Sequence, residues 1–300
     1  MANSNGWGDG AANNSIGWGQ GANNLISWGK SHSLSYAGLT DIVGVTTPAF
    51  DPDAQAFITA TAITDTTQQG AIDVLVKGLK TDLLWTKMLA IYPFVGGTAT
   101  TCKFNLKNPL DTDLGHRLNF VGGWTFSNNG VTPNGTTAYA NTFLSPSTHF
   151  TLGNSSISHY SRTNSVATGT PYGTKTGAAN SQLNISFGVG TSNIFHNTNS
   201  AFTLSPAPLT SATNLIHSRI NTTQTIAGLN GTMATYTNSE GQLSNHPIYL
   251  GARNNNNVTI DLYYSRQMAF AHIGTGLTQA ECILLYNRIQ TFQTTLGRQV

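Results

Sequence analysis

The sequence predicts an all-β dominated protein: an antiparallel β-sandwich with one α-helix before it, one α-helix at the C-terminus, and an extended Gly/Trp repeat in front. Three observations predict this fold class. Short runs that alternate apolar and polar residues fill the chain from about residue 102 to residue 272, turn residues separate these runs, and helical apolar periods stand on both sides of them. Many short strands at this spacing are typical of a sandwich.

The chain opens on three copies of one short phrase, centred on Trp7, Trp18 and Trp28. Glycine stands next to each of these rings, and glycine weakens helix and strand alike while offering no side chain to pack on. Each ring therefore needs a surface from outside its own segment. Three tryptophans in register are typical of an interaction pattern. We predict that residues 1–45 anchor or oligomerise the protein.

Residues 46–90 are predicted to be a linker followed by an amphipathic helix. Pro48 and the run Asp51-Pro52-Asp53 mark the linker. From Asp65 onward the pattern changes to a helical period, with Asp65 available as the N-cap. The predicted apolar face consists of Ile72, Leu75, Val76 and Leu79.

Residues 91–300 are predicted to be the sandwich domain with its C-terminal helix. The alternating runs predicted as strands include Cys102–Leu106, Ser156–Arg162, Leu183–Phe187 and Val258–Tyr264. The predicted tight turns are Asn128-Asn129-Gly130, Pro133-Asn134-Gly135 and Asn230-Gly231.

The N-terminus of the predicted C-terminal helix is marked by a capping sequence. Thr278 and Glu281 stand in the spacing of a capping box, and Leu285, Ile289 and Phe292 follow as an apolar stripe. Helices at both ends of the run of strands are expected to pack together or to cover one edge of the sandwich.

The composition excludes several function classes. Charged residues make up only 9% of the chain, against about 25% in an ordinary soluble domain. The net charge of +2 and the scattered Lys and Arg argue against a nucleic-acid partner. No run approaches the length of a membrane span, and the first residues do not resemble a secretory signal. Cys102 and Cys282 are predicted to be free thiols in a protein made in the cytoplasm.

Acidic residues offer weak support for catalysis, and no catalytic residue is predicted. Glycosidases on a β-sandwich need paired carboxylates, but the chain has only two glutamates, Glu240 in a turn and Glu281 in the capping box. Asp111 and Asp113 are the closest approach to a carboxylate pair. They could hold a calcium ion or flank a glycosidic bond, although a turn with Asx hydrogen bonds is favoured. No cofactor is expected, a structural calcium at this pair being the alternative.

Carbohydrate recognition is harder to exclude, because it needs only an aromatic platform and a few polar groups on loops. The run Asn254-Asn255-Asn256-Asn257 and the loop around Tyr172 are the candidates, against the plainer interpretation of a polar hairpin turn. Trp124 lies in a strand-like run and is assigned to the core. The eight histidines are dispersed, and no two have the spacing of a helical zinc site.

Several motifs resemble a family of virion proteins of tailed phages, including crAss-like phages and their relatives. The motifs are Tyr92-Pro93-Phe94-Val95-Gly96-Gly97, Phe120-Val121-Gly122-Gly123-Trp124-Thr125, Pro133-Asn134-Gly135-Thr136, His159-Tyr160-Ser161-Arg162-Thr163-Asn164, Tyr249-Leu250-Gly251-Ala252-Arg253 and the stretch Phe270–Arg298. The Gly-Trp-Gly repeats resemble N-terminal segments of such proteins. The resemblance implies a concanavalin-like (laminin-G-like) jelly roll and a location in the virion.

From this resemblance we expect a fibre, spike or decoration subunit whose jelly roll binds a host-surface glycan. Fibre proteins commonly trimerise, so the expected partners are two further copies of this chain and other virion proteins that receive the N-terminal repeats. A shared fold does not fix a function. The alternatives are a glycan-degrading enzyme that uses Asp111 and Asp113, and a purely structural capsid or tail scaffold without a ligand.

Overall fold

The computed structural model describes residues 49–163, 168–177, 179–188, 191–204 and 212–300. The predicted repeat with Trp7, Trp18 and Trp28 lies outside these residues. Within them the longer helices are α2 (Pro52–Thr61), α3 (Thr66–Thr81) and α6 (Gln279–Thr295). The short helical turns are η3 (Trp85–Lys87), α4 (Ala99–Cys102), η4 (Asp113–Gly115) and α5 (Pro146–His149).

One layer of the fold is an eight-stranded antiparallel sheet with the strand order β13-β12-β11-β6-β17-β4-β3, in which β1 also pairs with β17. The strands are β1 (Met88–Tyr92), β3 (Trp124–Ser127), β4 (Gly130–Pro133), β6 (Ser155–Ser161), β11 (Thr213–Arg219), β12 (Gln224–Leu229), β13 (Thr232–Thr237) and β17 (Met268–Gly274). Asn230 and Gly231 have positive φ angles of 48° and 83° and turn the chain between β12 and β13, as predicted.

The second layer contains a six-stranded sheet with the order β16-β15-β7-β14-β5-β2 and a three-stranded sheet with the order β10-β9-β8. The strands are β2 (Asn119–Val121), β5 (Tyr139–Asn141), β7 (Tyr172–Lys175), β8 (Leu183–Gly188), β9 (Thr191–His196), β10 (Phe202–Thr203), β14 (Tyr249–Leu250), β15 (Arg253–Asn255) and β16 (Thr259–Asp261). Neighbouring strands are antiparallel except β15 and β7, which are parallel. The predicted all-β sandwich with flanking helices is therefore confirmed.

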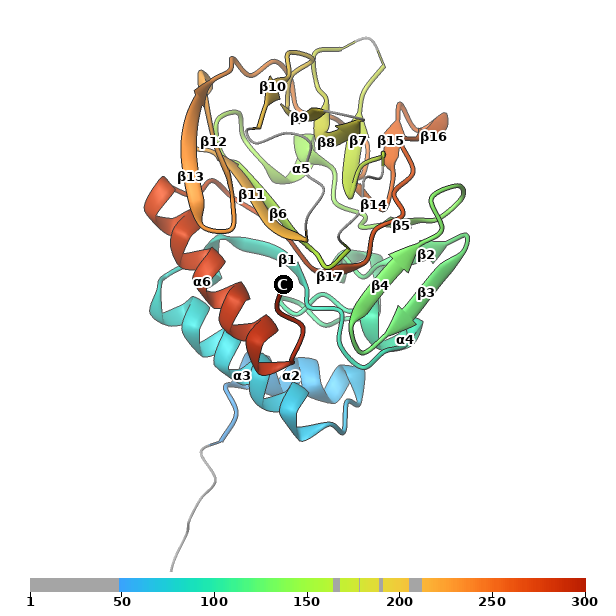
Figure 1. Ribbon diagram of the computed structural model, residues 1–300, viewed down its shortest axis with the longest axis vertical. Coiled ribbons are helices and arrows are strands. Elements are labelled where there is room, and N and C mark those ends of the chain that lie inside the picture. Colours follow the sequence, from blue (N-terminus) through green and yellow to red (C-terminus); the bar gives the residue numbers. More distant parts are fainter. Residues whose placement is uncertain (1–48, 164–167, 178, 189–190, 205–211) are drawn as a thin grey trace, which may run out of the picture. The chain divides into compact units, whose positions relative to one another are not determined.

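Two hydrophobic clusters hold the layers together. The inter-sheet cluster fills the space between the two layers and includes Ile157 and Leu215 from the eight-stranded sheet and Leu183 and Leu250 from the other layer. The helix-side cluster lies between the eight-stranded sheet and helices α3 and α6. In Figure 1, α3 and α6 lie side by side against that sheet.

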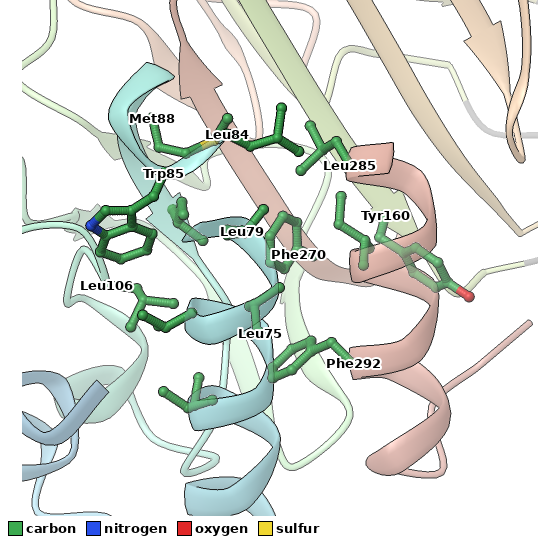
Figure 2. Close-up of a cluster of buried hydrophobic side chains, with 14 of the residues drawn as sticks. Leu75, Leu79, Leu84, Trp85, Met88, Leu106, Tyr160, Phe270, Leu285 and Phe292 are labelled. Carbon is green, nitrogen blue, oxygen red and sulfur yellow. The ribbon is translucent and has the colours of Figure 1, made fainter. Parts of the chain in front are cut away.

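Figure 2 shows the helix-side cluster, where Leu75 and Leu79 of α3 meet Leu285 and Phe292 of α6 over Phe270 of β17. Burying one such side chain contributes about 1.5–3 kcal/mol, so this face of the sheet is closed by a strongly favourable contact. The expectation that the two end helices pack together is confirmed, although they cover a face of the sheet rather than an edge.

The predicted helix starts are confirmed. The side chain of Asp65 accepts from the backbone N–H of Thr67 and caps α3, and Thr278 and Glu281 form the reciprocal capping box of α6. Helix α6 is further tied to α3 by Arg288, whose Nε and Nη2 donate to Asp82 at 2.7 and 2.8 Å.

Two sequence predictions about local structure are wrong. Residues of the predicted linker form α2, because Asp51 caps its N-terminus and Pro52 occupies the first turn, where a missing N–H costs nothing. The predicted strand Cys102–Leu106 begins instead with the last residue of α4 and continues without regular structure. There the side chain of Asn105 accepts a hydrogen bond from Ile91 N and donates one to Leu89 O. These bonds to β1 replace those that a neighbouring strand would make.

No helix in the described ranges is both long and apolar enough to cross a membrane.

Candidate functional site

The outer face of the six-stranded sheet is the candidate site. The eight-stranded sheet is covered on one side by the second layer and on the other by α3 and α6. The six-stranded sheet turns Ala140, Tyr172 and Leu250 into the inter-sheet cluster. Side chains alternate between the two faces of a strand, so the neighbours of these residues lie on the other face, away from the long helices (Figure 1).

Strand register aligns one residue from every strand of this sheet on that face. Asn119 pairs with Asn141, Asn141 with Tyr249, and Tyr249 with Gly173. Gly173 pairs with Arg253, and Arg253 with Asp261. Directly paired residues share a face. The transverse row is Asn119, Asn141, Tyr249, Gly173, Arg253 and Asp261. It runs through the free face, whose other residues are Val121, Tyr139, Lys175, Asn255 and Thr259.

Two tyrosines form a fixed aromatic surface on the free face. The rings of Tyr139 and Tyr249 are stacked, with centroids 4.7 Å apart and planes 20° from parallel. Tyr139 precedes Asn141 by two residues on β5 and is therefore the diagonal neighbour of Tyr249. Tyr249 is 9% exposed, whereas Tyr139 is half-buried and carries the more accessible ring. Burial raises the pKa of the Tyr249 hydroxyl, which keeps it protonated and able to donate.

A guanidinium and a carboxylate are locked together at the other end of the row. Arg253 Nε and Nη2 donate to Oδ1 and Oδ2 of Asp261, both at 2.8 Å, and Asn255 Nδ2 donates to the same carboxylate at 2.9 Å. A Cβ atom at Gly173 would lie 3.0 Å from Cβ and Cγ of Arg253 and 3.0 Å from Cβ of Asn184, so the glycine gives room to both side chains. The pair is preorganised because bidentate geometry fixes both planes.

The face as a whole combines an aromatic surface with planar polar groups. Asn119 is exposed and Asn141 is half-buried on either side of the tyrosine pair. The Asn141 Oδ1 atom accepts from Phe143 N, which fixes the orientation of its amide. Amide, phenol, guanidinium and carboxylate groups on a firm sheet can bind hydroxyl-rich ligands, since each presents several donors or acceptors in a fixed plane.

The structure separates the four asparagines predicted to bind a ligand. Asn254 points into the protein, is 1% exposed, and donates to Pro247 O. Asn255 lies on the free face beside Asp261. Asn256 and Asn257 form the exposed turn between β15 and β16, with φ angles of 61° and 54°. Asn254 therefore has a structural role, because its amide closes the turn by accepting from Asn257 N.

Tyr172 does not lie in a surface loop, and this prediction is wrong. It belongs to β7, has no exposed surface, and its hydroxyl shares a short hydrogen bond with His217 Nε2. Burial raises the pKa of this hydroxyl and lowers the pKa of the His217 imidazole. The strand alternation explains the difference: Tyr172 faces inward, and its neighbour Gly173 faces outward.

The interior contact of Tyr172 is the first link of a buried polar chain. His217 Nδ1 and His196 Nδ1 are 2.9 Å apart, and His196 Nε2 shares a hydrogen bond of 2.9 Å with Ser155 Oγ. Asn197 connects Ser155 to Glu240. A serine hydrogen-bonded to a histidine is the arrangement of a catalytic nucleophile and its general base. Ser155 is only 1% exposed, however, and His196 is fully buried, so this hydrogen-bond network is a structural link between the layers.

Asp111 and Asp113 are neutralised by protein cations rather than arranged around a metal. Arg117 contacts Asp111 at 3.0 Å and Asp113 at 3.2 Å, and Lys103 contacts Asp111 at 2.6 Å. The hydrogen bond from Lys103 holds the pKa of Asp111 below its usual value. Within the described ranges no group of three or more His, Cys, Asp or Glu side chains is placed to hold a metal ion. The two carboxylates thus already have protein cations as partners, which a calcium ion bound here would have to displace.

Sequence reasoning missed Tyr139, Tyr249, Arg253 and Asp261 as site residues. Their strands have two or three residues each, too short for a clear alternating pattern. A signal was present in Arg253 and Asp261, an oppositely charged pair on either side of an Asn-rich turn. A hairpin there places such residues opposite each other.

Comparisons with known proteins leave the family open. No protein-family model and no curated protein matches the chain in sequence. A mutant sialidase of Trypanosoma rangeli with trans-sialidase activity shares 10% identity at a TM-score of 0.49 over 73% of this chain and 39% of its own. The binding domain of botulinum neurotoxin serotype D shares 14% at 0.42 over 68% of this chain and 52% of its own.

A further similar structure is domain 4 of an extracellular arabinanase from Geobacillus stearothermophilus in complex with arabinotriose, with 16% identity and a TM-score of 0.38 over 67% of this chain and 98% of its own. The chain spans about two fifths of the sialidase and about half of the toxin binding domain. Likenesses this weak do not indicate a shared function.

Proposed function

We propose that this protein is a non-enzymatic carbohydrate-binding subunit and that the free face of its six-stranded sheet is the binding surface. The observation that carries the proposal is the transverse row, which brings two carboxamides, Tyr249 and an oriented Arg–Asp pair onto one sheet face, where Tyr139 stacks on Tyr249. Apolar ring faces and fixed hydrogen-bonding groups are the two needs of sugar recognition. Rigid strands hold both.

Hydrolysis of a bound glycan is not favoured by this face. Glycosidases of the common kind need two carboxylates that flank the scissile bond, about 5–9.5 Å apart. Asp261 is the one carboxylate among the free-face residues, and its oxygens already accept from Arg253 and Asn255. Asp111 and Asp113 are held by Lys103 and Arg117. Binding is therefore the better supported role.

We further propose that the protein is a virion subunit of a tailed phage, attached through residues 1–45 and presenting the glycan-binding domain to a host. The support is the resemblance of its motifs to such proteins and the repeated Gly-Trp-Gly phrase. Several weak aromatic anchors on one particle give firm attachment by avidity. The alternative of a scaffold without a ligand is decided by the same experiment as the glycan proposal.

The test is a glycan array probed with the full chain, followed by calorimetry on the retained glycans. Tyr139→Ala removes the more accessible ring and is expected to weaken binding about tenfold, whereas Tyr139→Phe keeps the stack and much of the affinity. The matched control is Tyr236→Ala, which breaks the stacked pair of Phe202 and Tyr236 away from the free face. Equal loss in both alanine variants would place the site elsewhere. A folded protein that retains no glycan would favour the scaffold role.

A further inference from the structure

We infer that the free face selects neutral oligosaccharides over acidic ones, an inference that rests on the proposed function. The charge arrangement of the face carries it. Arg253 and Asp261 neutralise each other through two bonds of 2.8 Å. The face therefore offers fixed hydrogen-bonding groups with little net charge.

The guanidinium of Arg253 is not available as a counter-ion for an acidic sugar. Arginine recognises carboxylates by a bidentate contact, and the Nε and Nη2 edge that makes such a contact is occupied by Asp261. The Arg253 side chain is 14% exposed and that of Asp261 is 34% exposed, so the acidic partner is the more accessible of the two. A ligand carboxylate approaching this end meets Asp261 and is repelled.

The hydrogen-bonding capacity that remains suits hydroxyl groups. A guanidinium has five N–H donors, and the contacts to Asp261 engage one on Nε and one on Nη2, which leaves the second donor on Nη2 and both donors on Nη1. Asp261 keeps lone pairs that can accept. A donor beside an acceptor in one plane matches neighbouring hydroxyls of a neutral sugar ring, each of which donates and accepts.

Lys175 is the other charged residue of the free face. It pairs in register with Asn255, two residues along β7 from Gly173, and forms no ion pair within the described ranges. One solvated ammonium on a flexible stem gives a weak, salt-screened attraction for anions. Salt weakens this attraction without changing the hydrogen-bonding geometry of the Arg253–Asp261 pair, so titrations at low and high salt separate the two effects.

The size of the row indicates an oligosaccharide rather than a single sugar. Six strands lie across it, and five spacings of about 4.8 Å give a length of about 24 Å. In this row Tyr249, on which Tyr139 stacks, lies on one side of Gly173 and the Arg–Asp pair on the other, so one extended ligand is needed to contact both.

The experiment compares matched ligands that differ only in the oxidation of C6. Homo-oligomers of glucose, galactose and mannose are titrated beside homo-oligomers of glucuronic, galacturonic and mannuronic acid, at low and high salt. We expect at least one neutral oligomer to bind with an affinity that salt does not change, and its acidic counterpart to bind at least about tenfold more weakly. Preference for an acidic oligomer, with affinity that falls as salt rises, overturns the inference.

The variant Asp261→Asn is the more specific test of the inference, because it keeps the shape of the side chain and leaves the positive charge of Arg253 unpaired. We expect the preference for neutral over acidic oligomers to fall about tenfold or to reverse at low salt. The control is Asp113→Asn, which removes one of the two carboxylates that pair with the half-buried Arg117, away from the free face, and should leave the preference unchanged. Circular dichroism and thermal unfolding establish that both variants fold. An unchanged preference in Asp261→Asn overturns the inference.

Failure of the inference and failure of the proposed function give different results. If acidic oligomers bind best and Tyr139→Ala abolishes that binding, the free face is a glycan site and only the neutral preference is wrong. If no oligomer of either class binds and the array retains nothing, both are wrong.

Discussion

The guanidinium of Arg298 donates a hydrogen bond of 2.8 Å to the backbone oxygen of Phe94, more than two hundred residues earlier in the chain. Arg298 is 1% exposed, and its other contacts include the backbone oxygens of Pro93 and Ala269, both at 3.1 Å, and Gln293 Oε1 at 2.9 Å. Burial lowers the pKa of this guanidinium to about 9. The residues just after α6 are thus fastened to the start of the sandwich by one side chain.

Replacement of Arg298 by methionine is expected to lower the free energy of unfolding by at least about 3 kcal/mol. Several buried carbonyl oxygens would lose their donor, and each unsatisfied group costs about 1–3 kcal/mol. The matched control is Arg117→Met, whose partners are exposed carboxylates and whose loss should cost less than about 1 kcal/mol. Urea unfolding of the two variants measures both values. A loss at Arg298 no larger than at Arg117 would contradict the role given to it.

The acid sensitivity of the fold should depend on buried histidines such as His159. Burial lowers the pKa of His159 to about 3, with Arg266 adding to the effect, and neither ring nitrogen has a hydrogen-bond partner among the described residues. Below the unfolded pKa of about 6.5 the unfolded chain binds a proton that the folded chain does not bind. The stability contributed by the neutral ring is therefore complete above about pH 6.5 and is lost as the pH falls toward about 3.

His159→Phe separates this effect from packing. The ring lies 6.0 Å from Tyr172 and 6.1 Å from Phe187, centroid to centroid, in an aromatic surrounding that accepts a phenyl group. We expect unchanged or higher stability at neutral pH, because no unpaired nitrogen remains buried, and a loss of stability with acid that is shallower by about 1 kcal/mol per pH unit. Unfolding free energies across the acid range measure the slope. An unchanged slope would show that His159 does not titrate on unfolding.

The capping box of α6 should contribute measurably to stability. Thr278 Oγ1 accepts from Glu281 N at 3.3 Å, and Glu281 Oε2 accepts from Thr278 N at 2.8 Å. Thr278→Ala is expected to lower the free energy of unfolding by about 1 kcal/mol, since the N–H groups of the first turn lose their side-chain acceptor. Thr295→Ala, in the exposed last turn of the same helix, is the control and should cause no loss. Equal effects at the two positions would argue against the box.

The sequence predicted elements whose signals are local and missed those that depend on partners. Asp65 and Thr278 mark helix starts because capping needs only the next three residues. Asp51 and Pro52 carry the same kind of signal for α2, but proline next to acidic residues is equally typical of the linker predicted there. Tyr172 and Gly173 show the opposite case, because a shift of one residue decides which of them faces outward.

The candidate site could not be assembled from the sequence for the same reason. Asn141, Tyr249, Gly173 and Arg253 come from four strands, and only their register places them in one row. The contact between Arg253 and Asp261 is the one part with a short separation along the chain. The buried role of Tyr172 depends on His217, a partner 45 residues away.

The proposed role of the repeat predicts a change of oligomeric state. If Trp7, Trp18 and Trp28 meet the same rings of two other copies, removal of residues 1–45 should convert a trimer to a monomer in light scattering. Each buried ring contributes about 2–3 kcal/mol, so loss of a single ring should weaken the trimer and loss of all three should abolish it. Replacement of all three by alanine in the full chain is the variant to compare, because it keeps the length of the segment. A trimer that survives both changes would make the repeat a docking segment for another virion protein and place the trimer contacts within residues 46–300.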